Sequence, residues 1–255
     1  MVHLKADWEL DAMRSSGRRL AEVSARLREV VDVGVSTQEL DRIAEEMIRG
    51  MGAVPAFKGY SVDGVPPFPA TICASPNQEV VHGIPTNEPL VDGDIISIDM
   101  GLHFGGYYAD HAFSTVVGSS NGKVKCLLDV TEQSLYDGIA AARAGARIGD
   151  IGHAIESVIR PQGFGIVRQY VGHGIGRSLH ERPSVPNYGK PNTGDLIKPG
   201  MCLAIEPMVT LGTWKTKTLQ DFWTVVTADG SLAAHFEHTI AITPNGTEIM
   251  TVLDG

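Results

Sequence analysis

The second half of the chain repeats residues of the first half in the same order, which constrains its fold strongly. Six residues recur 111 positions later, one of them conservatively changed: Gly34, Leu40, Glu45, Ile48, Arg49 and Gly52 return as Gly145, Ile151, Glu156, Ile159, Arg160 and Gly163. Three more echoes keep the order: His82-Gly83-Ile84 returns as His173-Gly174-Ile175, Ile98-Asp99 as Ile205-Glu206, and Asp110-His111 as Glu237-His238. This pattern predicts one domain, residues 1–255, built from two similar halves (roughly 8–118 and 122–248) that share a single site.

Both halves contain helix-like and strand-like segments. Apolar residues at helical spacing predict helices over residues 8–31, 36–50, 124–143 and 148–160. Ser36 followed by Glu39 predicts a capping box at the start of the second helix. Residues 59–69 are rich in Gly and Pro and predict a loop, and strand-like runs occupy residues 70–74, 79–82, 95–100, 107–117, 166–170, 201–209, 223–227 and 237–243. Together these segments predict a mixed α/β or α+β fold.

Composition excludes several classes of function. Lysine and arginine number 21 against 30 acidic residues, so the net charge of −9 opposes direct binding to nucleic acid or to an anionic membrane. No apolar run is long enough to span a bilayer, and the N-terminus lacks the pattern of a signal peptide. The three cysteines form no CxxC pair, which argues against a disulfide scaffold or a cysteine zinc site. We therefore expect a cytoplasmic protein.

Two carboxylates occupy matched positions in the repeat. Asp99 ends the apolar run Asp94–Ile98, and Glu206 ends the apolar run Met201–Ile205. One such residue alone is more often a loop cap or the partner of an arginine. Two of them at the ends of buried strands need cations, because a buried unpaired charge is energetically costly. Basic residues are scarce nearby, so the pair indicates a metal site.

Three more residues complete a set of metal ligands. Asp110 and Glu237 lie in strand-like runs, and His173 stands between two glycines that leave space for close approach. Four carboxylates and one histidine form a hard, oxygen-rich set that suits two divalent ions such as Co, Mn, Fe(II) or Zn. The two ions would balance the four negative charges, and paired metals can activate a bridging hydroxide as a nucleophile.

Two better-known motifs are excluded. The stretch Gly172–Gly176 lacks the GxGxxG spacing of a phosphate-binding loop, and prolines follow where a helix should start. His180-Glu181 is not the start of an HExxH zinc motif, because position 184 is a serine and Pro183 would break the required helix.

Five motifs follow one another through nearly the whole chain: Asn77-x-x-Val80-Val81-His82-Gly83-Ile84-Pro85, Ile98-Asp99-x-Gly101, Gly172-His173-Gly174-Ile175-Gly176-Arg177-x-Leu179-His180-Glu181-x-Pro183, Glu206-Pro207 and Glu237-His238-Thr239. In this order, and with the spacing from Asp99 to Asp110, they resemble the type I methionine aminopeptidases. The resemblance implies the "pita-bread" fold, in which two halves related by a pseudo-twofold axis surround a dinuclear metal site. We expect no N-terminal zinc-binding extension of the kind that eukaryotic cytosolic forms carry, and therefore a bacterial-type enzyme.

The resemblance also implies roles for individual residues. The metal ligands would be Asp99, Asp110, His173, Glu206 and Glu237, with Asp110 and Glu237 bridging the two ions. His180 would contact the scissile carbonyl and the tetrahedral oxyanion, His82 the scissile nitrogen, and Glu206 would carry a proton to the leaving amine. His111 and His238 would support the ligands beside them. The methionine pocket would contain Cys73, Phe68 and Trp223, whereas the run Val65–Pro69 replaces a motif with two aromatic residues and so implies that one aromatic wall is lost.

The implied reaction is hydrolytic removal of N-terminal methionine from nascent chains whose second residue is small. The implied partners are such chains and the ribosome that makes them, and the implied oligomeric state is a monomer. Two alternatives remain. A prolidase or aminopeptidase P shares the fold and ligands but usually carries an additional N-terminal domain. A non-catalytic binding module would have lost metal ligands, whereas the five predicted ligands and both His82 and His180 are present here.

Overall fold

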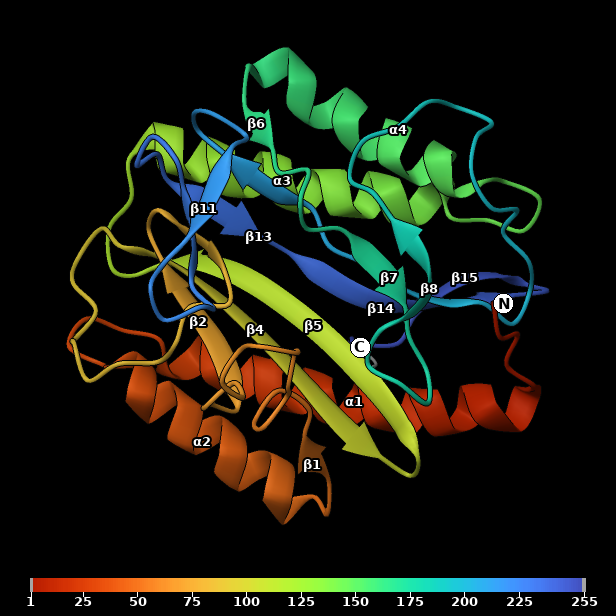
Figure 1. Ribbon diagram of the computed structural model, residues 1–255, viewed down its shortest axis with the longest axis horizontal. Coiled ribbons are helices and arrows are strands. Elements are labelled where there is room, and N and C mark those ends of the chain that lie inside the picture. The colour runs from red at the N-terminus through yellow and green to blue at the C-terminus, as the bar shows by residue number, and fades with distance from the viewer. Residues whose placement is uncertain (1, 254–255) are drawn as a thin grey trace.

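The computed structural model describes residues 2–253, so residues 1, 254 and 255 of the predicted domain lie outside the described part (Figure 1). The helices are α1 (Asp7–Val30), α2 (Thr37–Gly50), α3 (Gly122–Ala141) and α4 (Ile148–Ile159), with a 3-10 turn at Arg160–Gln162. The strands are β1 (Val54–Pro55), β2 (Ile72–Pro76), β3 (Glu79–Val81), β4 (Ile95–Phe104), β5 (Tyr107–Val116), β6 (Gly165–Ile166), β7 (Gly172–Gly174), β8 (Glu181–Val185), β9 (Cys202–Ile205), β10 (Met208–Thr210), β11 (Thr216–Thr218), β12 (Val225–Thr227), β13 (Ala233–His235), β14 (Glu237–Thr243) and β15 (Gly246–Ile249).

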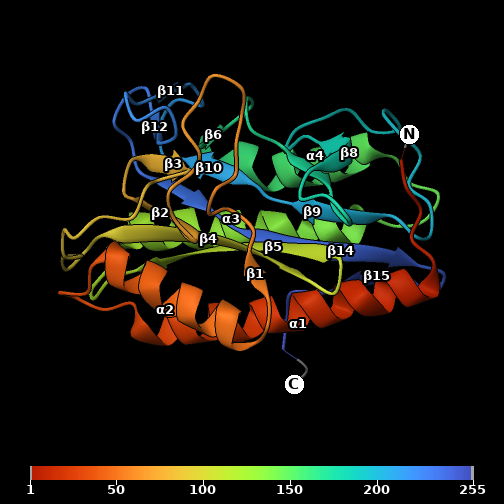
Figure 2. The ribbon, with the colours of Figure 1, turned by 60° about the horizontal axis from the view of Figure 1, so that its bottom comes forward.

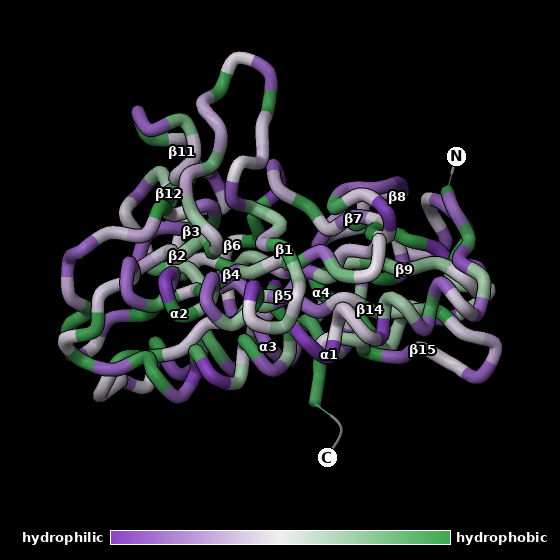
Figure 3. Tube along the Cα trace, turned by 90° about the horizontal axis from the view of Figure 1, so that it is seen from below, coloured by the Kyte–Doolittle hydropathy of each residue, from purple (hydrophilic) through white to green (hydrophobic). Residues whose placement is uncertain are grey.

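One antiparallel sheet joins the two halves of the chain. Its strands run in the order β1-β4-β5-β14-β9-β7-β8, with β2 added to β4 and β15 to β14. Two smaller sheets, β13-β10-β6 and β11-β12-β3, complete the β structure of the described residues. Figure 3 shows α1, α2 and α3 along one side of the large sheet and β11 and β12 on the other. The helices therefore cover one face and leave the opposite face for a site.

The helix-covered face holds the main hydrophobic core. Leu20, Val23 and Leu27 of α1 are fully buried and belong to the same apolar cluster as Ile96 and Ile98 of β4. Apolar residues at helical spacing thus meet the inward residues of a strand, as the sequence pattern requires. No helix within residues 2–253 combines the length and apolarity needed to cross a membrane.

The sequence repeat corresponds to a repeat of turn geometry. Gly34 and Gly145 both have left-handed backbones, with φ of +89° and +88°, in the turns that precede α2 and α4. The amide of Gly34 donates to the carbonyl of Leu90 at 2.8 Å, and that of Gly145 donates to Ile197 at 3.0 Å. Each turn is therefore tied to a loop that leads into a ligand-bearing part of the sheet: β4, which carries Asp99, and β9, which Glu206 follows.

The mixed α/β class is confirmed, and the helix boundaries differ from the predicted ones by small amounts. α1 is shifted by one residue and α3 by two from the predicted ranges. The capping box forms only in part: Ser36 Oγ accepts from the amide of Glu39 at 3.2 Å, whereas the carboxylate of Glu39 pairs with Arg42 at 2.6 Å. A nearby guanidinium thus competes for the carboxylate. The exact boundaries of the two half-repeats stay a prediction.

Two strand predictions were wrong in part. The run 201–209 is divided into β9 and β10 at Glu206-Pro207, because proline has no amide to donate to a neighbouring strand. Of the run 166–170, only Ile166 lies in a strand. Six strands were not predicted at all: β1, β7, β8, β11, β13 and β15.

We predict that Gly145→Ala and Gly34→Ala each destabilise the protein by about 1–2 kcal/mol, because an L-residue is strained in a left-handed conformation. A Cβ at either position would meet no heavy atom within 4 Å, so backbone strain alone should account for the loss. Gly50→Ala at the end of α2 is the matched control, since its site is equally open but its φ is not positive. The measurement is the urea unfolding midpoint of each variant. Equal midpoints for all three variants would contradict the prediction.

Candidate metal centre and active site

Strand register places carboxylates from both halves on one face of the large sheet. Asp99 of β4 pairs with Cys73 of β2 on one side and with Ala112 of β5 on the other. Ala112 in turn pairs with Glu237 of β14. Directly opposed residues of antiparallel strands point to the same face, and so does Asp110, two residues before Ala112. The register therefore brings Asp99, Asp110 and Glu237 together.

His173 and Glu206 approach the same place from the second half. Nε2 of His173 lies 3.8 Å from Oδ2 of Asp110 and 3.6 Å from Oε1 of Glu206. Nδ1 of His173 lies 2.9 Å from the carbonyl oxygen of Gly174, which can only accept, so Nδ1 carries the proton. Nε2 is left with its lone pair directed at the carboxylates, which is the arrangement of a metal-binding histidine.

The cluster has the electrostatics of a cation site. Buried oxygens of Asp99 (Oδ1), Asp110 (Oδ1) and Glu237 (Oε1) have no hydrogen-bond partner among the described residues. Burial raises the pKa of Asp110 to about 7, and burial with the neighbouring Asp110 raises that of Glu206 to about 8. Burial and nearby carboxylates also raise the pKa values of Asp99 and Glu237 well above their usual range.

Divalent cations would relieve this repulsion, and the donors fit them. Asp110, His173 and Glu237 each offer a ligand atom within 4.8 Å of the others. Carboxylate oxygens and a neutral imidazole are the ligands that Mn, Fe, Co and Zn accept. The residues present therefore fit the metal chemistry that the sequence predicted.

His82 and His180 lie beside the carboxylates. The ring of His180 is 4.4 Å from that of His173, and its Nδ1 is 3.0 Å from the hydroxyl of Tyr60. His82 follows β3 with a φ of +60°, a rare conformation for a residue other than glycine. Burial lowers the pKa of both histidines, that of His82 to about 4, so both are neutral near pH 7. A neutral imidazole can donate one hydrogen bond to a substrate.

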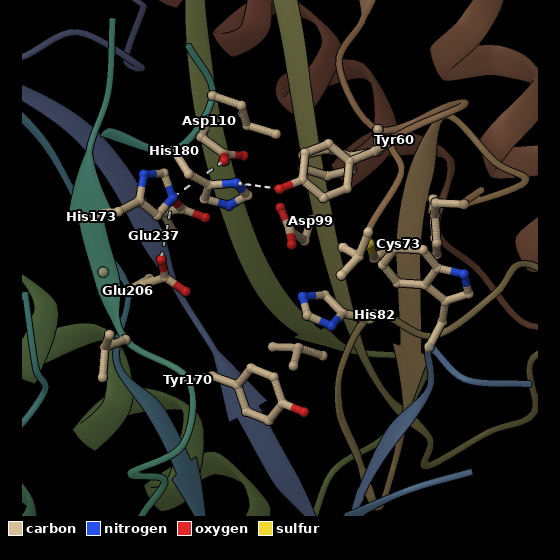
Figure 4. Close-up of a pocket in the computed structure, with 18 of the residues that line it drawn as sticks. Tyr60, Cys73, His82, Asp99, Asp110, Tyr170, His173, His180, Glu206 and Glu237 are labelled. Carbon is tan, nitrogen blue, oxygen red and sulfur yellow. Dashed lines mark hydrogen bonds and ion pairs between the residues drawn. The ribbon is translucent and has the colours of Figure 1, made fainter. Parts of the chain in front are cut away.

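All ten sequence-predicted site residues line one cavity of about 320 Å³. Figure 4 shows His173, Glu206, Glu237 and Asp110 at one end of the cavity and Cys73 at the other, with Asp99 between them. The far end is apolar: the rings of Phe68 and Trp223 meet edge to face at 5.3 Å, and Cys73 is almost fully buried. The cavity thus joins a charged end to an apolar end.

Tyr60 also lines the cavity and adds an aromatic ring that the motifs did not mark, while the expected loss of one aromatic wall at Val65–Pro69 stays a prediction. The amide of Phe68 donates to the carbonyl of Tyr60 at 2.9 Å, and the amide of Gly59 donates back to Phe68 at 2.8 Å. These bonds close the excursion of residues 61–67 and place the Tyr60 ring 6.5 Å from that of Trp223. Tyr60 was missed because seven residues separate it from Phe68 in the sequence.

His235 is a second residue that sequence reasoning missed. Its side chain is buried, neither ring nitrogen has a hydrogen-bond partner among the described residues, and Nε2 lies 3.8 Å from Oε2 of Glu206. Its position two residues before Glu237 was the available signal, since alternate residues of an extended chain share a face.

His111 and His238 lie on the opposite, helix-covered side of the sheet. The two residues are register partners, and their rings stack at 4.7 Å with an interplanar angle of 18°. Nε2 of His111 bonds Ser24 of α1 at 2.9 Å, and Nδ1 of His238 bonds Thr251 at 2.8 Å. Strand alternation therefore directs each carboxylate into the cavity and the next residue into the core.

The raised carboxyl pKa values predict how metal and pH act on stability. A raised folded-state pKa contributes stability at low pH that is lost as pH rises through it, so metal-free protein should lose stability from pH 7 to 8.5. The histidines His82, His173 and His235, with pKa values of about 4, 3 and 3, are neutral throughout this window. Mn²⁺ at 100 times its Kd should add about 2.7 kcal/mol, roughly 5–11 °C in Tm, and remove most of the loss. Calorimetry that finds no metal effect on Tm at pH 8 would contradict this assignment.

Sequence comparison supports a specific family. A family model described as "Metallopeptidase family M24" matches residues 11–244. Methionine aminopeptidase 1 of Bacillus subtilis is 50% identical over 251 residues, covering 98% of this chain and 99% of that protein. Methionine aminopeptidase 1 of Mycobacterium tuberculosis is 47% identical over 99% of this chain and 96% of its own length.

Solved structures agree with the sequence comparison. The methionine aminopeptidase of Rickettsia prowazekii superposes with a TM-score of 0.95 at 39% identity, covering 99% of this chain and all of that one. Prolidase from Pyrococcus furiosus shares the fold alone, with a TM-score of 0.78 at 21% identity, and this chain covers only 66% of it. With a family model that spans most of its length and close relatives that match it from end to end, the chain belongs to metallopeptidase family M24 and has the pita-bread fold.

Proposed function

We propose that this enzyme removes N-terminal methionine from newly made chains whose second residue is small. The proposal rests on one observation. The carboxylate cluster and an apolar end lined by Phe68, Cys73 and Trp223 face each other within the same cavity. An unbranched thioether side chain suits such an apolar end. The names of the relatives support the same substrate class.

In this proposal two divalent ions would be held by Asp99, Asp110, His173, Glu206 and Glu237. When bound, they supply a water activated as nucleophile and a Lewis acid for the scissile carbonyl. The four carboxylates match the charge of the two ions, which explains why they can share a buried site.

The protein's own side chains then act on the peptide. His180 donates a hydrogen bond to the carbonyl oxygen as negative charge develops on it, while Tyr60 bonds the other ring nitrogen at 3.0 Å. Glu206 takes a proton from the attacking water and delivers it to the leaving nitrogen, which His82 orients. Because the free α-amine of the substrate must reach the cluster, cleavage follows the first residue.

The walls of the cavity set the side-chain preference. The Trp223 ring is held by a bond from its Nε1 to the carbonyl of Pro66 at 2.8 Å and contacts Phe68 edge to face. A fixed wall of this kind discriminates among apolar side chains by about 1–3 kcal/mol per methylene. Substrates would be chains emerging from the ribosome in the cytoplasm, where a monomer suffices because one chain supplies every proposed ligand.

The direct test measures free methionine released from Met-Ala-Ser by metal-free protein and by protein with added Mn²⁺ or Co²⁺. We expect metal-dependent release of methionine from this peptide and no release of alanine from Ala-Pro-Ser, which is assayed in the same way for its first residue. Cleavage of Ala-Pro-Ser alone would instead place the enzyme with the proline-specific peptidases. Failure on both peptides with metal bound would favour a binding module.

We also predict that His180→Ala lowers kcat by about 10²–10³ without loss of bound metal, as expected when one donor to the oxyanion is removed. KM should change little, because the bond strengthens only as charge develops. Tyr60→Phe is the matched comparison: it keeps the aromatic wall but removes the bond to His180, so its loss should be smaller. Wild-type kcat in His180→Ala would remove His180 from the mechanism.

A further inference from the structure

The short segment that carries His180 has little regular structure of its own. Residues 175–180 connect β7 to β8, and their internal bonds are few: the amide of Gly176 donates to the carbonyl of Ser178 at 3.1 Å. The amide of Ser178 donates to Oε1 of Glu181 at the same distance. Such a segment needs outside contacts to hold a side chain precisely.

One contact to the His180 end of this segment comes from residues 2–6, the N-terminal segment that precedes α1. Nζ of Lys5 lies 2.8 Å from Oε2 of Glu181, the residue after His180. The Lys5 side chain is 2% exposed, so this is a buried ion pair between residues 176 positions apart. A Cβ on Gly176 would lie 2.6 Å from Cε of Lys5, so the lysine stem lies directly against the backbone of the segment.

A second contact holds the beginning of the segment. Oε1 of Glu9, in the first turn of α1, accepts from Arg177 at 3.2 Å and from the hydroxyl of Tyr107 at 2.7 Å. Its other oxygen, Oε2, accepts from the amide of Ala6 at 3.0 Å. Glu9 is buried although Arg177 is exposed, so the carboxylate is a fixed anchor for a surface loop.

The N-terminal segment is itself fixed to the sheet. The amide of Lys5 donates to the carbonyl of Gly200 at 2.7 Å, just before β9. Figure 2 shows the segment passing from the level of β8 and β9 down to α1 on the other side of the sheet. Lys5 and Glu9 therefore link the segment of His180 to the sheet and to α1.

We propose that Lys5 and Glu9 are positioning residues that hold His180 at the scissile carbonyl. The inference rests on the proposed function of His180 and adds the part of the chain that fixes its place. Neither residue touches the cavity, so each acts through the segment between Gly176 and Glu181. Displacement of a catalytic group by about 1 Å can cost about 10²-fold in rate, which gives the scale of the expected effect.

The test compares Lys5→Met with a control variant, Lys125→Met. The control removes an exposed ion pair between Lys125 and Asp129, both on α3, and neither residue lines the cavity. We expect Lys5→Met to lower kcat for Met-Ala-Ser by about 10- to 100-fold. KM and the Kd for Mn²⁺ should stay within about twofold, because the change touches neither the pocket nor a ligand. Lys125→Met should match wild type throughout.

A double variant separates positioning from general stabilisation. If Lys5 acts through His180, adding Lys5→Met to His180→Ala should lower kcat by no more than about twofold further. A full additional loss in that background would overturn the proposal. So would normal kcat in Lys5→Met. Should Lys5→Met fail to fold, Glu9→Gln, which loosens the Arg177 end, takes its place in the same cycle.

Hydrogen exchange keeps this inference distinct from the proposed function. Exchange at Gly176 and Ser178 should be slow in wild type and in Lys125→Met but faster in Lys5→Met, whatever the enzyme hydrolyses. Lack of hydrolysis by wild type, with this exchange pattern intact, would refute the proposed function and leave the anchoring by Lys5 standing. Unchanged exchange in Lys5→Met would refute the anchoring itself.

Discussion

The mutual repulsion of four buried carboxylates is the constraint on which the rest of the structure depends. Asp99, Asp110, Glu206 and Glu237 are held together on one face of an antiparallel sheet, in surroundings that raise the pKa of each. These charges are screened less in the cavity than in bulk water, so apolar packing behind the sheet must resist their separation. The fully buried leucines and isoleucines between α1 and β4 supply that packing.

Much of the site could be predicted because each ligand carries a local signature. Asp99 and Glu206 each end an apolar run, and the same short patterns return in the second half in the same order. Strand alternation then fixes which residues share a face, and the register between distant strands brings the ligands of the two halves together. The sequence could not reveal that register directly, since the pairing of β5 with β14 joins residues more than a hundred positions apart.

The parts that escaped prediction are those decided by tertiary hydrogen bonds. Tyr60 becomes part of the cavity wall through backbone bonds that close the loop of residues 61–67, and no periodicity reports such a closure. Strands of two or three residues, such as β1 and β11, are too short to show alternation. The division of β9 from β10 was readable, because Pro207 removes the amide that a continuous strand would need. The anchoring of residues 175–180 by Lys5 and Glu9 likewise links residues with no common motif.

The stacked pair His111 and His238 has a consequence for the carboxylates on the other face of the sheet. One peptide unit separates each imidazole from Asp110 or Glu237, two of the proposed metal ligands, and the imidazoles contact each other on the opposite side of the sheet. The register of β5 and β14 sets the spacing of the two backbones at this point, and the stacked rings, held by Ser24 and Thr251, pack directly behind it. Substitution of either histidine would therefore disturb the carboxylates from behind the sheet while every residue that lines the cavity stayed the same.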